Sequence, residues 1–365
     1  MTLSPQQDEA AKAVRAWLAD PGSPQVFYLA GYAGTGKTTI ARLLAEDAGK
    51  VVFGAFTGKA ALVLRGKGCP DASTIHSMIY KPEESEQGIT RFVLNQHDSA
   101  AASADLIVID EVSMVGAELG RDLLSFGKKV LVLGDPAQLP PVGDATGYFT
   151  KREPNYMLTE IHRQAENNPI LSLATTVRNG GRLELGAYGA SLVIHRKDVT
   201  QKMVLGVDQV LVGMNKTRRA TNEKIRKLLG RSGRFVEHDR VVALRNDKDK
   251  GLLNGGIWEV AEIELQDQDE TEMIVRPLDA GMAVNAVEVK THHAWIDGRE
   301  KEIPWTRQKE YQPFDFAYAL SVHKAQGSQW DSVLVIDESY VFKEDRAKHL
   351  YTAITRAAER VIVAI

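Results

Sequence analysis

A phosphate-binding pattern decides the fold of this chain: GYAGTGKT at residues 31–38. It follows a short apolar run at residues 26–30 and precedes a helical pattern at residues 38–48. Between a strand and a helix, G-x-x-x-x-G-K-[ST] is typical of loops whose backbone N–H groups converge on phosphates. In such loops the lysine reaches the β- and γ-phosphates and the hydroxyl ligates Mg²⁺. The nucleotide-binding residues predicted here are Gly31, Ala33, Gly34, Thr35, Gly36, Lys37, Thr38 and Thr39.

Further apolar runs at residues 51–56, 106–109 and 130–133 are separated by helical patterns. Continuous apolar strands of this kind predict a parallel sheet that is buried on both faces. Because ligands bind at the carboxyl ends of such strands, the residues that follow the runs are candidates for chemistry. Alone, an acidic pair there is more often a cap or a solvated turn, but the phosphate loop reverses that preference. We expect Asp110 to bind Mg²⁺, Glu111 to be the general base, and Gln138 to contact the γ-phosphate and the attacking water.

The second half repeats the α/β pattern, with strands expected at 210–212, 333–336 and 361–365 and helices at 221–229 and 350–359. Residues 241–312 instead alternate apolar and polar side chains between glycine-rich turns, which is typical of small antiparallel β structures. The sequence therefore predicts an α/β protein with three parts. They are a first domain at 1–150 with a small hairpin-like insertion at about 80–98, a second domain at 151–240 and 313–365, and a β insertion at 241–312.

Composition supports a protein of two domains without a membrane span. The chain has 365 residues, 44% hydrophobic and 25% charged, and no apolar run nears the roughly 20 residues that a span needs. Its net charge is -3, but residues 201–250 have an excess of seven positive charges and residues 251–310 an excess of seven negative charges. Nucleic-acid binding would therefore use a local basic surface. The single Cys69 and the absence of a signal-peptide pattern predict a cytoplasmic location.

Nine ordered motifs give the chain a specific resemblance to the superfamily 1B DNA helicases of the RecD/Dda type. They span nearly the whole sequence: LSPQQ at 3–7, GYAGTGKT at 31–38, FTGKAA at 56–61, STIHS at 73–77, VIDEVSM at 108–114, LVLGDPAQLPPVG at 131–143, LTEIHRQ at 158–164, SVHKAQGSQWD at 321–331 and YTAITRA at 351–357. The resemblance implies two RecA-like domains with parallel sheets that close on Mg·ATP. The β insertion would be SH3-like, with a tight turn at Asn254–Gly256.

The resemblance also assigns roles to individual residues. Arg163 and Arg356 match arginine fingers, and both fall within the expected second domain; Gly327 lies in a segment that links the nucleotide to the strand. Gln7 matches a glutamine that reads adenine, but Ser4, Pro5 and Gln7 also form a capping-box pattern, so both interpretations stay open. The residues that match contacts to single-stranded DNA are Thr57, Lys59, Thr74, His76, Ser321, His323 and Lys324.

The function implied is an ATP-dependent 5′–3′ DNA helicase with ATP and Mg²⁺ at its active site. Its expected partners are single-stranded DNA, junctions of single- and double-stranded DNA, and replication or repair proteins, with no membrane and a monomeric state. The alternatives are a translocase or helicase subunit of a repair complex that does not unwind alone, an RNA motor, and a small-molecule phosphotransferase. We further expect the acidic insertion to serve unwinding and to be removable, and His292 and His293 to be surface residues.

Overall fold

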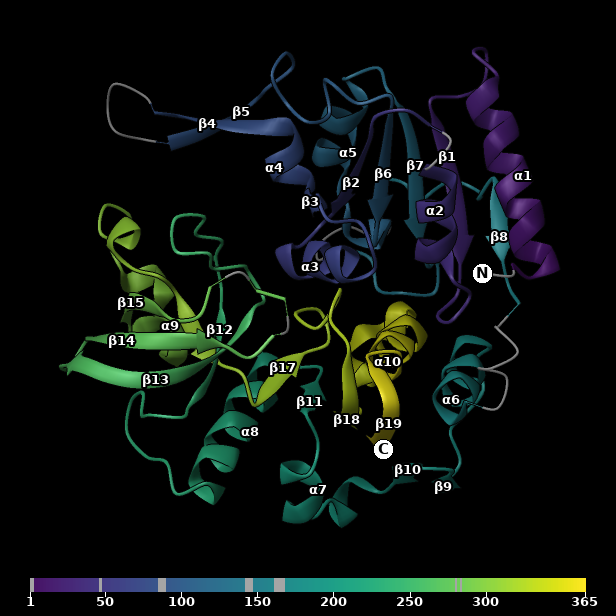
Figure 1. Cartoon of the computed structure of the whole chain (residues 1–365). Coiled ribbons are helices and arrows are strands. Elements are labelled where there is room, and N and C mark those ends of the chain that lie inside the picture. Colours follow the sequence, from purple (N-terminus) through teal and green to yellow (C-terminus); the bar gives the residue numbers. More distant parts are fainter. Residues whose placement is uncertain are drawn as a thin grey trace. The chain divides into compact units, whose positions relative to one another are not determined.

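A computed structural model describes residues 3–45, 48–84, 90–141, 147–160, 168–279, 281–282 and 284–365 (Figure 1). The chain forms two compact units, Met1–Arg178 and Asn179–Ile365. The boundary lies after the predicted position near residue 150, because strand β8 (Tyr156–Leu158) returns to pair with β1 (Val26–Gly31) before the chain leaves the first unit. None of the described helices is both long and apolar enough to cross a membrane.

The first unit is built on a six-stranded sheet in the order β3-β2-β6-β7-β1-β8, in which every pairing is parallel. The parallel sheet predicted from the apolar runs is therefore confirmed. Its remaining strands are β2 (Val51–Ala55), β3 (Ser73–Thr74), β6 (Leu106–Asp110) and β7 (Lys129–Gly134).

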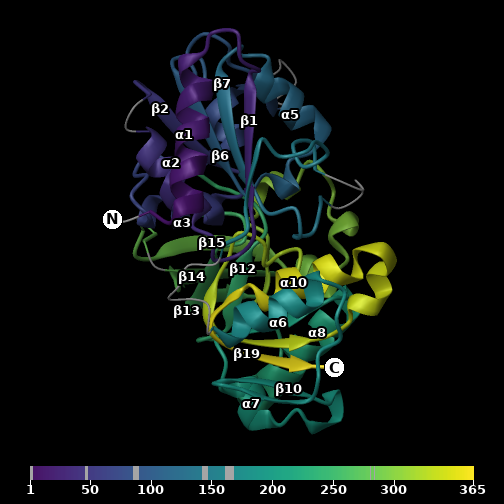
Figure 2. The ribbon, with the colours of Figure 1, turned by 90° about the vertical axis from the view of Figure 1, so that its right-hand side faces the viewer.

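Helices cover both faces of this sheet. Figure 2 shows α1 and α2 on one face and α5 on the other. Alternate residues of β1 accordingly pack in opposite directions: Phe27 and Leu29 contact the α1–α2 side, whereas Val26 and Tyr28 contact the α4–α5 side. The helices of this unit are α1 (Pro5–Ala19), α2 (Lys37–Ala45), α3 (Gly58–Gly66), α4 (Ile75–Ile79), the 3₁₀ turn η1 (Val112–Met114), α5 (Ala117–Leu124) and α6 (Pro169–Arg178).

A two-stranded antiparallel hairpin projects from the first unit where an insertion was predicted. Its strands are β4 (Tyr80–Glu84) and β5 (Thr90–Leu94), and Pro82 is registered opposite Phe92. The Phe92 side chain is 70% exposed, an unusual position for an aromatic ring.

The second unit has a sheet in the order β17-β11-β18-β19-β10-β9, parallel except at β9. Figure 2 shows β10 beside β19. The strands are β9 (Gly186–Tyr188), β10 (Ser191–Ile194), β11 (Gln209–Val212), β17 (Ala319–Ser321), β18 (Trp330–Ile336) and β19 (Ala357–Ala364). The helical segments are η3 (Arg196–Asp198), α7 (Gln201–Leu205), α8 (Asn215–Leu228), η6 (Ser339–Asp345) and α10 (Arg346–Ile354).

One helix end in this unit was predicted wrongly. The expected helix at 350–359 stops at Ile354, and β19 begins at Ala357. Sheet pairing explains the difference, because Ala357 is registered beside Trp330 and the strand continues along β18. Long-range pairing thus overrides the local helical pattern.

A five-stranded antiparallel sheet interrupts the second unit, in the order β15-β14-β13-β12-β16. The two ends of the insertion lie together, because β12 and β16 pair with each other. The predicted tight turn is present: the Gly256 N–H donates to the Leu253 carbonyl, and Gly255 has a φ of 84°. The strands and short helices are β12 (Arg240–Ala243), β13 (Ile257–Gln266), β14 (Glu270–Pro277), β15 (Val287–His292), α9 (Ala294–Asp297), η4 (Glu300–Glu302), η5 (Gln308–Glu310) and β16 (Phe314–Phe316).

His293 corrects the expectation of two surface histidines. Its side chain is buried, its Nε2 lies 2.8 Å from the Thr271 hydroxyl, and its Nδ1 lies 3.0 Å from the Gln268 carbonyl. Burial lowers its pKa. The pair His292–His293 straddles the end of a strand, where the two side chains point to opposite sides, so only His292 stays partly exposed.

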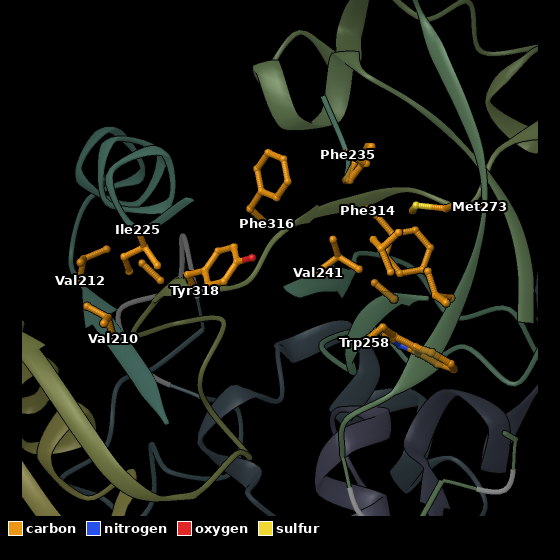
Figure 3. Close-up of a cluster of buried hydrophobic side chains, with 14 of the residues drawn as sticks. Val210, Val212, Ile225, Phe235, Val241, Trp258, Met273, Phe314, Phe316 and Tyr318 are labelled. Carbon is orange, nitrogen blue, oxygen red and sulfur yellow. The ribbon is translucent and has the colours of Figure 1, made fainter. Parts of the chain in front are cut away.

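The insertion and the parallel sheet of the second unit share one hydrophobic core. Figure 3 shows Val210, Ile225 and Tyr318 continuing through Phe316 to Phe314 and Trp258. Trp258 and Phe314 are fully buried. Excision of the insertion would expose this core to water, which argues against the expectation that the fold survives its removal.

Buried ion pairs anchor helix α8 to the same junction. Arg226 forms two hydrogen bonds to Asp239, from Nε at 3.0 Å and from Nη2 at 2.9 Å, and its guanidinium lies over the Phe316 ring. The Tyr318 hydroxyl donates to the same carboxylate at 2.9 Å. Asp239 is fully buried, and its charge is compensated mainly by Arg226 and, at 3.9 Å, by Arg231.

Replacement of Asp239 by Asn should lower the free energy of unfolding of the second unit by about 3–5 kcal/mol, because it leaves the Arg226 charge buried without its partner. Chemical denaturation followed by tryptophan fluorescence, to which buried Trp258 and the other four tryptophans contribute, measures the loss. The matched control is Glu302→Gln, which breaks an exposed pair with Arg299 and should cost at most about 1 kcal/mol. Equal effects of the two variants would contradict this account.

Candidate active site

The phosphate-binding loop joins β1 to α2 as predicted. Gly34 and Gly36 have φ values of 79° and 78°, in the left-handed region that favours glycine. A Cβ on Gly31 would lie 2.6 Å from the Thr35 hydroxyl, so this position is also confined to glycine. Ala33 lies within the loop and Thr39 in the first turn of α2. The loop therefore has the backbone that phosphate binding requires at a helix N-terminus.

Lys37 lies over this loop. Its Nζ donates to the Gly31 carbonyl at 2.5 Å and to the Tyr32 carbonyl at 2.9 Å. Both acceptors are neutral, and an ammonium group binds anionic phosphate oxygens more strongly than neutral carbonyls. The side chain is therefore held beside the place where the loop would receive phosphates.

A hydroxyl and a carboxylate meet at the carboxyl ends of β1 and β6. The Thr38 hydroxyl donates to Asp110 Oδ2 at 2.8 Å, and Asp110 Oδ1 accepts from the Glu111 N–H at 2.8 Å. Oxygen donors of this kind suit Mg²⁺, which typically takes one or two protein ligands and completes its shell with water and phosphate oxygens. The described residues contain no group of three or more His, Cys, Asp or Glu side chains that could hold a metal ion.

Glu111 has a left-handed backbone, with φ 55° and ψ 44°. A non-glycine residue pays about 1–2 kcal/mol for this conformation. Such strain at a strand end is found preferentially where a side chain has to be aimed for chemistry.

The loop after β7 carries Gln138. Its N–H donates to the Asp135 carbonyl, and Asp135 Oδ1 accepts from the Ala137 N–H at 2.9 Å. The Gln138 side chain is buried, yet within the described residues its Oε1 accepts no hydrogen bond. A buried acceptor without a partner is costly, which fits a group whose partner arrives with a ligand.

Sequence reasoning missed Tyr28, whose buried hydroxyl also lacks a partner within the described residues. Burial, helped by the charge of Asp135, raises its pKa. Only its position on a buried strand that ends in the phosphate loop could have pointed to it.

Gln7 satisfies both the helix cap and the phosphate loop. Its Oε1 accepts from the Ser4 N–H at 3.0 Å, which completes a capping box, and its Nε2 donates to the Thr35 carbonyl at 3.0 Å. The predicted capping box is confirmed. The amide also lies against Gly36, where a Cβ would come within 2.6 Å of Nε2.

The residues of the first unit that were predicted to contact single-stranded DNA also lie at the carboxyl ends of the parallel strands. Ala55 is registered beside both Thr74 and Asp110, and Thr57 follows two residues later. The hydroxyls of Thr57 and Thr74 cap α3 and α4 by accepting N–H groups. Lys59 is buried in α3. His76, whose ring packs near Phe56 and Tyr80, has its pKa lowered by burial.

In the second unit, Ser321 is the last residue of β17, and His323 and Lys324 follow that strand. The Ser321 hydroxyl accepts from the Lys324 N–H at 3.4 Å. Burial lowers the pKa values of both His323 and Lys324. Gly327 has a φ of 74°.

Arg356 is buried, and its guanidinium donates to the Thr352 and Ser328 carbonyls at 3.2 Å each and to the Thr355 hydroxyl at 3.5 Å. These are neutral acceptors, and in the described part of the chain no carboxylate pairs with it. A buried charge without compensation is costly, which fits a group that receives an anion. Arg163 lies outside the described residues, and its position in the sequence precedes the boundary at Arg178, so only Arg356 falls in the range of the second unit.

Comparison with family models gives two matches. Residues 2–198 match an AAA domain, and residues 316–364 match a UvrD-like helicase C-terminal domain. The first match alone covers more than half of the chain, which is enough to assign the chain to a family.

Related proteins extend the similarity. The chain is 31% identical over 363 residues to the ATP-dependent RecD2 DNA helicase of Deinococcus radiodurans, with 91% of this chain and 46% of the relative covered. It is 26% identical to the ATP-dependent DNA helicase PIF1 of Xenopus laevis, with 90% of this chain and 57% of the relative covered. The chain thus spans about half the length of these two relatives.

Solved structures share the fold. The Pif1 helicase from Bacteroides in complex with ADP-AlF3 and ssDNA aligns over 100% of this chain and 93% of its own, with 18% identity and a TM-score of 0.60. The Pif1 helicase from Candida albicans gives 17% identity and a TM-score of 0.59, over 100% and 95% of the two chains. Both units are therefore RecA-like α/β domains.

Substitution Gly36→Ala should reduce the affinity for Mg·ATP at least about tenfold, an effect of 1.4 kcal/mol. The new Cβ displaces the Gln7 amide and strains the backbone at a φ of 78°. Titration with a fluorescent ATP analogue measures the loss. The matched control is Gly230→Ala, which has a φ of 72° and open space around the Cβ, and should keep full affinity. Full affinity in a folded Gly36→Ala protein would contradict the predicted loop geometry.

Proposed function

We propose that this chain, which belongs to the superfamily 1B helicases of the RecD/Pif1 type, is an ATP-dependent DNA helicase that moves 5′ to 3′ on single-stranded DNA. The observation that carries the proposal is a single sheet edge in the first unit. There the phosphate loop follows β1, and Thr38 bonds to Asp110, the last residue of β6. Thr74 is the last residue of β3, and Thr57 lies two residues after the end of β2. The residues proposed to act on the nucleotide thus lie next to those proposed to contact single-stranded DNA.

At this edge the residues fit Mg·ATP. Thr38 and Asp110 would hold Mg²⁺, which when bound neutralises charge on the β- and γ-phosphates. Lys37 would exchange the Gly31 and Tyr32 carbonyls for phosphate oxygens. Glu111 would accept a proton from the attacking water. Gln138 would orient that water with its side-chain oxygen, which accepts no hydrogen bond from the described residues.

The two arginines would act on the charge that develops on the γ-phosphate. A guanidinium is always charged and forked, so it stabilises phosphate oxygens in the transition state. Arg356 is suited to this role because it is buried among neutral acceptors. We assign the same role to Arg163 from its motif. With Arg356 in one unit and the phosphate loop in the other, hydrolysis would be linked to relative movement of the units.

DNA would be held through its backbone. Thr57, Thr74 and Ser321 present hydroxyls, which contact phosphates without reading bases, as a sequence-independent motor requires. We assign Lys59, His76, His323 and Lys324 to the same strand path. The exposed Phe92 of the β4–β5 hairpin supplies an apolar side chain for parting a duplex.

Two measurements test this function. ATP hydrolysis should rise several-fold with single-stranded DNA and less with RNA of the same length. A forked duplex with a 5′ tail should be unwound, and one with only a 3′ tail should not. Equal or stronger stimulation by RNA would support an RNA motor, stimulated hydrolysis without unwinding would support a translocase or a subunit that needs replication or repair partners, and absence of any stimulation would refute a nucleic-acid motor.

The variant Lys37→Ala should lose ATP hydrolysis by a factor on the order of several hundred, because a charge contact to the transition state is worth about 3–4 kcal/mol. Binding of single-stranded DNA in the absence of nucleotide should stay within about twofold of the original. Lys151→Ala, an exposed lysine of the same unit, is the control and should leave both properties unchanged. Normal turnover by Lys37→Ala would refute the assigned role.

A further inference from the structure

Helix α8 in the second unit has two contrasting faces. Its inner face is locked into the junction with the insertion: Arg218 pairs with Asp315 at 2.5 Å, and the Asn222 side chain bonds the Phe316 carbonyl and the Ala319 N–H. Its outer face is exposed and polar. The residues of that face that carry charge are Lys216, Arg219, Glu223, Lys224 and Lys227.

The outer face is strongly basic in a chain whose net charge is -3. Residues 215–234 contain eight Lys or Arg and only one acidic residue, Glu223. Four of the basic residues are paired with Asp side chains: Arg218, Arg226, Arg231 and Arg234. The four others form no ion pair with any described residue: Lys216, Arg219, Lys224 and Lys227. The unpaired positive charge is therefore concentrated on the exposed face.

The exposed face of α8 begins beside the residues of the second unit that we propose to contact single-stranded DNA. Figure 1 shows α8 next to β17, and Asn222 accepts from the Ala319 N–H at 2.7 Å, two residues before Ser321. Strand β11 ends at Val212, which is registered beside Ser321, and α8 begins three residues later at Asn215. From Lys216 to Lys227 the helix rises about 16 Å, so the positive charges form a row that leads away from Ser321 and Lys324.

We propose that the exposed face of α8 is a second contact surface for the phosphates of single-stranded DNA, which guides the strand beyond the contacts at Ser321 and Lys324. The inference rests on the proposed function. A row of Lys and Arg along a helix matches the regular charges of a nucleic-acid backbone, and α8 contains no aromatic residue with which to stack on bases. The surface therefore adds affinity and salt dependence without sequence preference.

The test compares the triple variant Lys216→Gln, Lys224→Gln and Lys227→Gln with a control triple variant, Lys67→Gln, Lys151→Gln and Lys248→Gln, which removes three exposed lysines elsewhere. Fluorescence anisotropy gives the Kd for oligothymidylates of increasing length at several salt concentrations. Short oligonucleotides should bind both variants and the original chain alike. Long ones should bind the α8 variant more weakly, with a log–log salt slope smaller by about 2, or roughly 0.7 for each lost phosphate contact.

A further measurement compares oligonucleotides that are extended at the 5′ end with those that are extended at the 3′ end. Oligonucleotides lengthened at one end only should reveal the α8 effect for one end and not for the other, because the face lies on one side of Ser321. Identical length and salt dependence in the α8 variant and the original would overturn the inference, as would a loss confined to duplex DNA. Failure of the original chain to bind single-stranded DNA at any length would overturn the proposed function, and this inference with it.

Discussion

Parallel pairing of β2, β6, β7 and β1 is the constraint on which the rest of the site depends. Register places Ala55 beside Asp110, and Ala30 beside Gly134, so these strands end at the same edge. The residues that follow these strands therefore all lie at that edge. They are the phosphate loop after β1, Glu111 after β6, Gln138 after β7 and Thr57 after β2. The hydrogen bond from Thr38 to Asp110 is a consequence of this pairing between strands distant in sequence.

Sequence motifs were enough to predict which residues lie at this edge of the sheet. The glycine pattern at residues 31–38 requires left-handed backbone at Gly34 and Gly36, and the structure has it. The apolar runs predicted the parallel sheet because a strand buried on both faces needs no polar alternation. The Ser4–Gln7 capping box was likewise readable, since all its partners lie within four residues.

The remaining features depend on contacts that local patterns do not encode. Residues 355–359 read as helix, but pairing with β18 draws Ala357 into a strand. His293 reads as polar surface, but a hydrogen bond to Thr271 in the neighbouring strand holds it inside. The insertion reads as a separate module, but Trp258 and Phe314 share their core with the parallel sheet. Arg226 pairs with a carboxylate, whereas Arg356 has none among the described residues, and this contrast also appears only in three dimensions.

Because the residues proposed to bind nucleotide and those proposed to bind single-stranded DNA lie at the same edge of the sheet, we expect the binding of the two ligands to be energetically coupled. The most direct measurement is a pair of titrations: the Kd for single-stranded DNA with and without a non-hydrolysable Mg·ATP analogue, and the Kd for that analogue with and without DNA. Linkage requires the same factor in both, and we expect it to be on the order of tenfold. Affinities for each ligand that do not change in the presence of the other would contradict the account.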